Sequence, residues 1–143
     1  MKVIFQSRIY RSDLKNNPDL LYLFGDNDLR MGYGGQAREM RGESNALGIR
    51  TKLLPTMEKE AFMNDEDFKR FVDMIRFDIA TMNHIMTKHN YFGIVVPSDG
   101  LGTGLSELPQ RAPKVYDSLN TMLAINLNMN VKDFPWMMES RSE

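Results

Sequence analysis

Two glycine-rich segments of the sequence carry residue types that bind anions. The first covers residues 25–38 and contains the pair Gly34-Gly35. The second covers residues 97–105 and has glycine at three alternating positions. Glycine lets a backbone approach a ligand closely, and successive N–H groups of such a loop can converge on an anion. The two segments together predict one site for a phosphate-bearing ligand.

The predicted site residues lie at the ends of expected strands or just after them. The expected ligand-binding residues are Gly25, Asp26, Asn27, Gly34, Gly35, Gln36, Arg38, Thr51, Lys52, Pro97, Asp99, Gly100, Leu101, Gly102, Thr103, Gly104 and Leu105. Asp26 and Asn27 can hydrogen bond to base or ribose groups. Asp26 and Asp99 are also the candidate catalytic carboxylates, because hydrolysis needs a general base or an activated water.

A short helix is expected directly after the glycine pair. Residues 36–40 are good helix formers, and a helix N-terminus offers free N–H groups to phosphate. Arg38 and Arg41 lie on or just past this helix, where they can clamp a phosphate or serve only as exposed charges. Neither segment carries a Walker A or GxGxxG fingerprint. The alternative for both segments is turn formation alone, which glycine, aspartate and asparagine favour.

Composition excludes several classes of protein. The 143 residues carry 18 Lys+Arg and 19 Asp+Glu, and this balance gives no indication of nucleic-acid binding. Because the sequence has no cysteine, disulfides, thiolate catalysis and cysteine-based zinc sites are excluded. We expect no metal and no cofactor. No stretch approaches the roughly 18 apolar residues of a membrane span, and the apolar run at the start is too short for a signal peptide, so we expect a cytoplasmic protein without a membrane partner.

Apolar runs alternate with helical patterns along the chain. The expected strands cover residues 3–5, 20–24, 46–49 and 91–96. Between the last two, apolar side chains recur at spacings of three and four over residues 68–86, which predicts a long helix capped by Asn64 or Asp65. Another helix is expected from Pro113. Such alternation predicts an α/β fold with a mixed, largely parallel sheet, in which ligands bind beyond the carboxyl ends of the strands.

The sequence predicts a single domain over residues 1–143. It contains no internal repeat, low-complexity tract or linker rich in proline, glycine or serine. Near the end of the chain, Phe134 and Trp136 are expected to dock on the body of the domain. Residues 137–143 are expected to fray because the tail ends in polar residues.

At these positions the sequence resembles a family of small macrodomain-like proteins common in bacteriophages and bacteria. The matching segments are residues 23–27, residues 34–42, residues 45–49 with Thr51 and Lys52, and residues 97–105. The resemblance spans roughly residues 8–125. It implies a macrodomain-like three-layer α/β/α sandwich that binds ADP-ribose, with Gly100 to Leu105 around the diphosphate and Asp26 and Asn27 facing the adenine or distal ribose. The sequence lacks the Asn-Ala-Ala-Asn signature of catalytic macrodomains, so the resemblance implies a ligand class rather than a reaction.

Three functions from different classes remain open at the level of sequence. The first is binding of an ADP-ribose-type, NAD-derived nucleotide without turnover, through which a phage protein sequesters a host defence signal in the host cytoplasm. The second is an ADP-ribosyl hydrolase. The third is an interaction module that inhibits a host enzyme through the methionine-rich helix and the aromatic tail. His84 and His89 are expected to be surface residues rather than catalytic ones.

Overall fold

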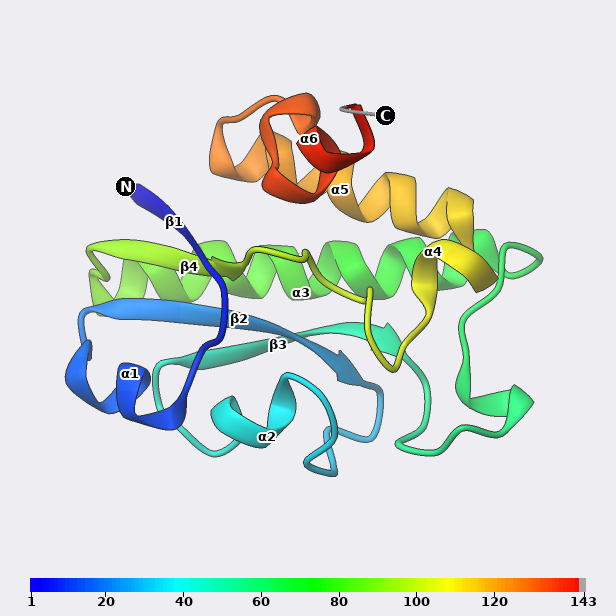
Figure 1. Ribbon diagram of the computed structural model, residues 1–143, viewed down its shortest axis with the longest axis horizontal. Coiled ribbons are helices and arrows are strands. Elements are labelled where there is room, and N and C mark those ends of the chain that lie inside the picture. Colours follow the sequence, from blue (N-terminus) through cyan, green and yellow to red (C-terminus); the bar gives the residue numbers. More distant parts are fainter. Residues whose placement is uncertain (142–143) are drawn as a thin grey trace.

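The computed structural model describes residues 1–141 of the chain (Figure 1). Its sheet has four strands in the order β1-β4-β2-β3, and every pair is parallel. The strands are β1 (Lys2–Gln6), β2 (Leu20–Asn27), β3 (Ala46–Lys52) and β4 (Gly93–Pro97). The predicted α/β class is therefore confirmed. No strand is antiparallel in the described sheet, and antiparallel pairing is limited to a single bridge between Lys52 and Phe62.

Helices connect the strands and continue beyond the last one. They are α1 (Arg11–Asn16), α2 (Ala37–Met40), α3 (Phe68–His89), α4 (Leu108–Arg111), α5 (Pro113–Leu127) and α6 (Pro135–Arg141), with short 3-10 turns η1 (Lys59–Ala61) and η2 (Val131–Asp133). Figure 1 shows α1 and α2 below the sheet and α5 and α6 above it. None of the described helices is long and apolar enough to cross a membrane.

Alternation along the strands explains why helices cover both faces of the sheet. Leu21 and Leu23 of β2 pack in one core with α3 and α5, whereas Tyr22 and Phe24 pack in a second core with Leu14 of α1 and with α2. Successive side chains of a strand point to opposite faces, so an unbroken apolar run is buried on both sides. This is why the run at residues 20–24 has no polar residue until the strand reaches its carboxyl end.

The long helix α3 begins later than expected from Asn64 or Asp65 as its N-cap. It starts at Phe68 with Asp67 at the N-cap position, and Phe68 itself is exposed. The Asp65 carboxylate instead accepts hydrogen bonds from the backbone N–H groups of Lys114 (3.0 Å) and Val115 (3.1 Å). Asp65 therefore caps α5, a helix almost fifty residues away in the sequence, because the orphan N–H groups of a helix start accept any nearby carboxylate.

The aromatic tail docks as predicted. Phe134 and Trp136 are buried, their rings stack with centroids 4.5 Å apart, and both meet the Phe5 ring of β1 edge-on. The predicted fraying of residues 137–143 falls in part outside the described residues. Within them, α6 extends to Arg141 and Met137 packs against the core.

A glycine on β3 makes room for a charged side chain of β2. A Cβ added at Gly48 would lie 2.7 Å from Cβ and 2.9 Å from Cγ of Asp26, which is buried. By contrast, a Cβ added at Gly104 would meet no atom within 4 Å. The two positions therefore differ in the space available for a side chain and not in backbone strain, since neither glycine has a positive φ.

We predict that Gly48→Ala lowers the free energy of unfolding by about 1–3 kcal/mol, the usual cost of overpacking a filled interior. Urea denaturation measures it. Gly104→Ala is the matched control and should change stability by no more than about 0.5 kcal/mol. Equal stability of Gly48→Ala and the wild type would contradict the tight packing of Asp26 on β3.

Candidate functional site

A pocket of about 810 Å³ lies at the edge of the sheet where β1, β2 and β4 end. We call it the main pocket. It is lined by Gln6, Ser7, Arg8, Ile9, Gly25, Gly34, Gly35, Gln36, Glu39, Met40, Pro97, Ser98, Asp99, Gly102, Thr103, Gly104, Leu105, Ser106 and Trp136. All strands are parallel, so the segments that follow them converge on this edge, which is the place where open α/β sheets bind ligands. The volume suits a nucleotide-sized ligand.

A smaller cavity of about 120 Å³ adjoins the main pocket toward β3. We call it the Lys52 chamber. It is lined by Gly25, Asp26, Asn27, Met31, Gly32, Tyr33, Gly34, Ala37, Arg41, Lys52, Pro55, Leu105 and Ser106. Gly25, Gly34, Leu105 and Ser106 line both cavities. The two cavities therefore adjoin each other, with residues of three segments between them.

Most of the predicted ligand-binding residues lie at these cavities. Those at the main pocket are Gly25, Gly34, Gly35, Gln36, Pro97, Asp99, Gly102, Thr103, Gly104 and Leu105. Asp26, Asn27 and Lys52 line the Lys52 chamber. The two glycine-rich segments also touch each other, because a Cβ at Gly34 would lie 2.9 Å from a methyl carbon of Leu105.

Four predicted residues line neither cavity. Arg38 is exposed on α2, and its backbone carbonyl accepts a hydrogen bond from Arg11. Thr51 is fully buried, with its Oγ1 2.7 Å from the hydroxyl of Ser106. The other two belong to the second glycine-rich loop but face the body of the protein: Gly100 packs against Trp136, and Leu101 is part of the hydrophobic core.

Five consecutive backbone N–H groups beside the main pocket have no protein acceptor. They belong to Gly102, Thr103, Gly104, Leu105 and Ser106, and none donates a hydrogen bond to any residue in 1–141. Most backbone N–H groups that are not in water find an acceptor, so an unpaired run beside a pocket is available to a ligand. Left-handed glycines before and within the run turn the backbone as an anion-binding nest requires.

The expected helix N-terminus beside Gly34-Gly35 is not a dipole site. The helix α2 spans only Ala37–Met40, a single turn. Gln36 instead holds the two loops together: its Oε1 accepts from the N–H of Gly25 (2.8 Å), and its Nε2 donates to the carbonyl of Gly100 (3.1 Å). The loop backbone, rather than a helix dipole, thus supplies the donors at this edge.

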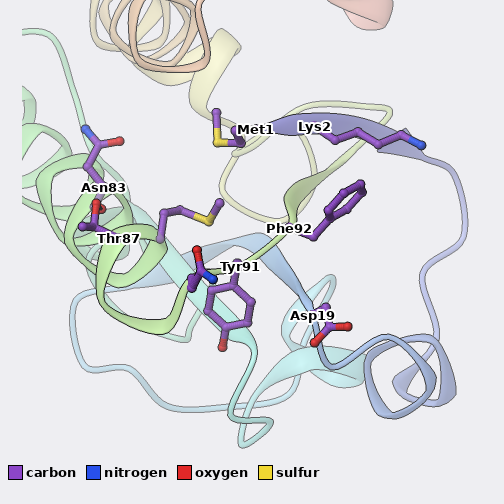
Figure 2. A pocket seen from close by; sticks show the side chains of 9 residues that line it. Met1, Lys2, Asp19, Asn83, Thr87, Tyr91 and Phe92 are labelled. Atoms are coloured by element: carbon purple, nitrogen blue, oxygen red, sulfur yellow. Dashed lines mark hydrogen bonds between the residues drawn. The ribbon is translucent and has the colours of Figure 1, made fainter.

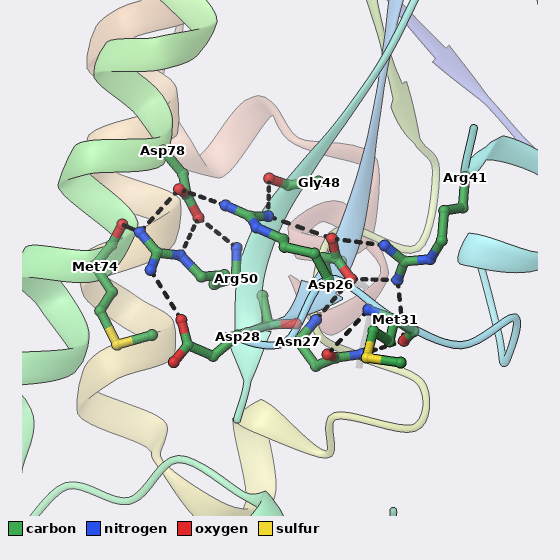
Figure 3. Close-up of polar contacts among 12 residues, drawn as sticks. Asp26, Asn27, Asp28, Met31, Arg41, Gly48, Arg50, Met74 and Asp78 are labelled. Atoms are coloured by element: carbon green, nitrogen blue, oxygen red, sulfur yellow. Dashed lines mark hydrogen bonds and ion pairs between the residues drawn. The ribbon is translucent and has the colours of Figure 1, made fainter. Parts of the chain in front are cut away.

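The Asp26 carboxylate is fully engaged by the protein. Arg41 donates to both of its oxygens, Arg30 donates to Oδ2 at 3.3 Å, and the N–H of Asn27 donates to Oδ1 at 2.8 Å (Figure 3). Asn27 donates in turn to the carbonyl of Met31 at 2.7 Å. These bonds fix the segment that follows β2. Because both carboxylate oxygens already accept these hydrogen bonds, Asp26 is poorly placed to contact a reacting water.

A second buried carboxylate extends the same network to α3. Asp78 accepts from Arg30 (2.9 Å) and from the side chain and backbone N–H of Arg50, and Arg50 also pairs with Asp28 at 3.0 Å (Figure 3). Burial lowers the pKa of the Arg50 guanidinium, but the hydrogen bonds to the two aspartates outweigh it and raise the pKa overall. The positive charges of Arg30, Arg41 and Arg50 thus equal in number the negative charges of the aspartates with which they pair, Asp26, Asp28 and Asp78.

Lys52 is the cation that this network leaves uncompensated. The residue is 6 % exposed, and its Nζ lies 3.4 Å from the sulfur of Met57 and 4.9 Å from the centre of the Phe62 ring. Among residues 1–141, no oxygen accepts a hydrogen bond from this amine, and no carboxylate forms an ion pair with it. Desolvation lowers the pKa of Lys52; the nearby Glu107 acts in the opposite direction.

Sequence reasoning missed the segment after β1. Ser7, Arg8 and Ile9 line the main pocket, and Arg8 adopts a left-handed φ of 51°. The charged side chains at this pocket are Arg8, Glu39 and Asp99, and none of them forms an ion pair within residues 1–141. The only indication in the sequence was the position of Arg8 just beyond a strand, because this segment contains no glycine.

Another hollow lies at the opposite edge of the sheet, where the strands begin (Figure 2). It measures about 1030 Å³ and is lined by Met1, Lys2, Asp19, Asn83, Met86, Thr87, Asn90, Tyr91 and Phe92. Its charged residues, Lys2 and Asp19, form no ion pair in the described structure. Ligands of parallel sheets bind at the other edge, so we do not assign function to this hollow.

Neither histidine lines the main pocket or the Lys52 chamber. His84 and His89 are exposed on α3. No group of three or more histidine or acidic side chains is placed to hold a metal ion within residues 1–141.

The fold and the two cavities define an α/β protein with a parallel sheet and a ligand-sized pocket at the carboxyl edge. Residues 4–122 match a family of unknown function, DUF7831, and the chain belongs to this family. The matched residues include both glycine-rich loops and the arginine–aspartate network. A comparison with curated proteins found no match, and a comparison with solved structures found none either.

We predict that Asp78→Asn destabilises the fold by about 1.5–3 kcal/mol, because it removes the carboxylate that Arg30 and Arg50 share and leaves each arginine with one anionic partner, Asp26 or Asp28. Urea denaturation followed by circular dichroism measures this change. Asp73→Asn on the same helix is the matched control. Asp73 is exposed and, within residues 1–141, pairs only with Lys69 and Arg76, so the loss of its charge should have a small effect. Similar stabilities of the two variants would contradict a structural role for the network.

Proposed function

We propose that the protein binds an ADP-ribose-type nucleotide in the main pocket without turning it over. The observation that carries the proposal is the run of five unpaired N–H groups from Gly102 to Ser106 beside a pocket of about 810 Å³. Backbone N–H groups in such a loop recognise the oxygens of a diphosphate. The resemblance to macrodomain-like proteins points to the same ligand class and to a three-layer sandwich of that type.

The side chains of the main pocket suit the adenosine half of such a ligand. Ile9, Met40 and Trp136 offer apolar surface to a base, and the carboxylates of Glu39 and Asp99 can accept hydrogen bonds from ribose hydroxyls. Because these carboxylates repel phosphate, the diphosphate belongs at the loop backbone rather than beside them. This division of the pocket supports a nucleotide over a simple anion.

Binding without turnover is favoured over hydrolysis. Asp26, one of the candidate catalytic carboxylates, is held by Arg41, Arg30 and the N–H of Asn27. Asp99 is exposed at the pocket, but no described side chain hydrogen bonds to its carboxylate to orient it as a base. A protein that binds without cleaving suits sequestration of a NAD-derived defence signal in a host cytoplasm, the role that the resemblance suggests.

We predict that Gly104→Glu lowers the affinity for ADP-ribose by at least about tenfold, because it places a negative charge beside the loop that holds the diphosphate. Isothermal titration calorimetry measures the affinity. Gly104→Gln is the matched control for side-chain size and should bind much more tightly than Gly104→Glu. Gly104 has room for a side chain and no positive φ, so both variants should fold.

Chromatography of the ligand after incubation distinguishes binding from hydrolysis. Recovery of intact ADP-ribose, with no release of ADP-ribose from an ADP-ribosylated protein, supports a binding protein; a cleaved ligand or released ADP-ribose would shift the function to a hydrolase. If ADP-ribose, NAD and cyclic ADP-ribose isomers all fail to bind the wild-type protein, the nucleotide proposal is wrong. An interaction module would then become the working hypothesis.

A further inference from the structure

The Lys52 chamber combines a buried amine with a cavity that the proposed site does not account for. At about 120 Å³ it has room for roughly four water molecules, or for one small group of a ligand. Lys52 is more than nine-tenths buried, yet its contacts are a thioether and an aromatic face. A buried ammonium normally pairs with an anion, because its desolvation is otherwise costly.

The electrostatics of the two cavities differ in sign. Beside the Lys52 chamber, Arg30, Arg41 and Arg50 offset Asp26, Asp28 and Asp78. Glu107 and Arg111, which also act on Lys52, pair with each other at 2.8 Å, so the charge of Lys52 is in excess. The main pocket has Arg8 against Glu39 and Asp99, an excess of one negative charge. A ligand that spans both cavities therefore gains most when its anionic end lies at the chamber.

The backbone between the cavities reinforces this polarity. Leu105 and Ser106 line both cavities, and their N–H groups are the last two of the unpaired run. Lys52, Leu105 and Ser106 line the same cavity of about 120 Å³, so an anion held in it is close to donors of all three. Arg41 and Arg30 are committed to Asp26, so among the cations that residues 1–141 place around the chamber, Lys52 is the one without a carboxylate partner.

We infer that the Lys52 chamber is a phosphate subsite, in which the amine of Lys52 and the N–H groups of Leu105 and Ser106 bind a phosphate group of the ligand. This subsite sets the direction of the ligand: phosphate toward β3, hydroxyl-bearing groups toward Glu39 and Asp99. The inference rests on the proposed function only in taking the main pocket as the place of the rest of the ligand.

The test uses inorganic pyrophosphate as the probe, because it carries the phosphate chemistry without the nucleoside. Calorimetry should show binding to the wild type and at least about a tenfold loss of affinity in Lys52→Met, which keeps the apolar packing and removes the donor. Lys59→Met removes the same charge from an exposed lysine outside the chamber and should bind as the wild type does. Lys52→Arg should retain part of the affinity.

Two further readouts locate the effect at the chamber. The methyl resonance of Met57, assigned by its loss in Met57→Leu, should shift when pyrophosphate is added, because the Met57 sulfur is 3.4 Å from Nζ. Affinity should also fall as the pH rises through the lowered pKa of Lys52, since only the ammonium form attracts phosphate. In Lys52→Arg this fall should be absent, because arginine stays charged.

The outcomes separate this inference from the proposed function. Equal pyrophosphate affinity in the wild type and Lys52→Met, or no binding to either, overturns the phosphate subsite even if ADP-ribose binds. Pyrophosphate binding that depends on Lys52, with no binding of ADP-ribose or its relatives, supports the subsite and contradicts the nucleotide proposal. Binding of both ligands, each weakened by Lys52→Met, supports the two together.

Discussion

Two buried carboxylates determine how the carboxyl edge of this sheet is built. Asp26 lies near the end of β2, and its side chain packs against Gly48 of β3. Its carboxylate forms ion pairs with Arg41 and Arg30, and Arg30 also pairs with Asp78 on α3. One chain of ion pairs thus joins two strands, the segment after β2, the end of α2 and the long helix. Buried ion pairs contribute little net stability, but separating the partners leaves a buried charge without compensation. Other arrangements of the same elements would separate these partners and are therefore disfavoured.

The pocket depends on that fixed geometry. With Asp26 and Asn27 held in place, the segment after β2 returns to present Gly34 and Gln36 to the second loop. Gly25 lies beneath both: a Cβ there would be 3.1 Å from Oγ1 of Thr51 and 3.2 Å from the N of Gly102. No larger residue at this position would allow the second loop to approach β2 so closely. The backbone of the second loop is therefore positioned by packing and side-chain hydrogen bonds, without a helix dipole.

The sequence predicted what local patterns can encode. Apolar runs located the four strands, the spacing of three and four located α3, and the rule for parallel sheets placed both glycine-rich loops at one edge. It did not predict which polar residues serve the fold. Asp26 has the sequence context of a ligand-binding residue, and its two arginine partners, Arg30 and Arg41, come from separate segments. Asp65 caps a distant helix, and Asp78 is buried in mid-helix; only the tertiary fold brings their partners to them.

The wall of the main pocket combines two parts of the chain with different relations to the family. The loops lie within residues 4–122, which match DUF7831, whereas Trp136 lies beyond them. A Cβ at Gly100 would be 3.0 Å from the Trp136 ring, and Gly100 has a φ of 85°. The start of the second loop therefore packs closely against Trp136 of α6. The loop backbone that we propose binds phosphate lies in the family region together with Ile9 and Met40, whereas Trp136 completes the apolar wall of the pocket from the C-terminal helix. In the proposed mode of binding, contact with phosphate therefore needs only residues of the family region, while contact with the attached group also uses Trp136 from outside it.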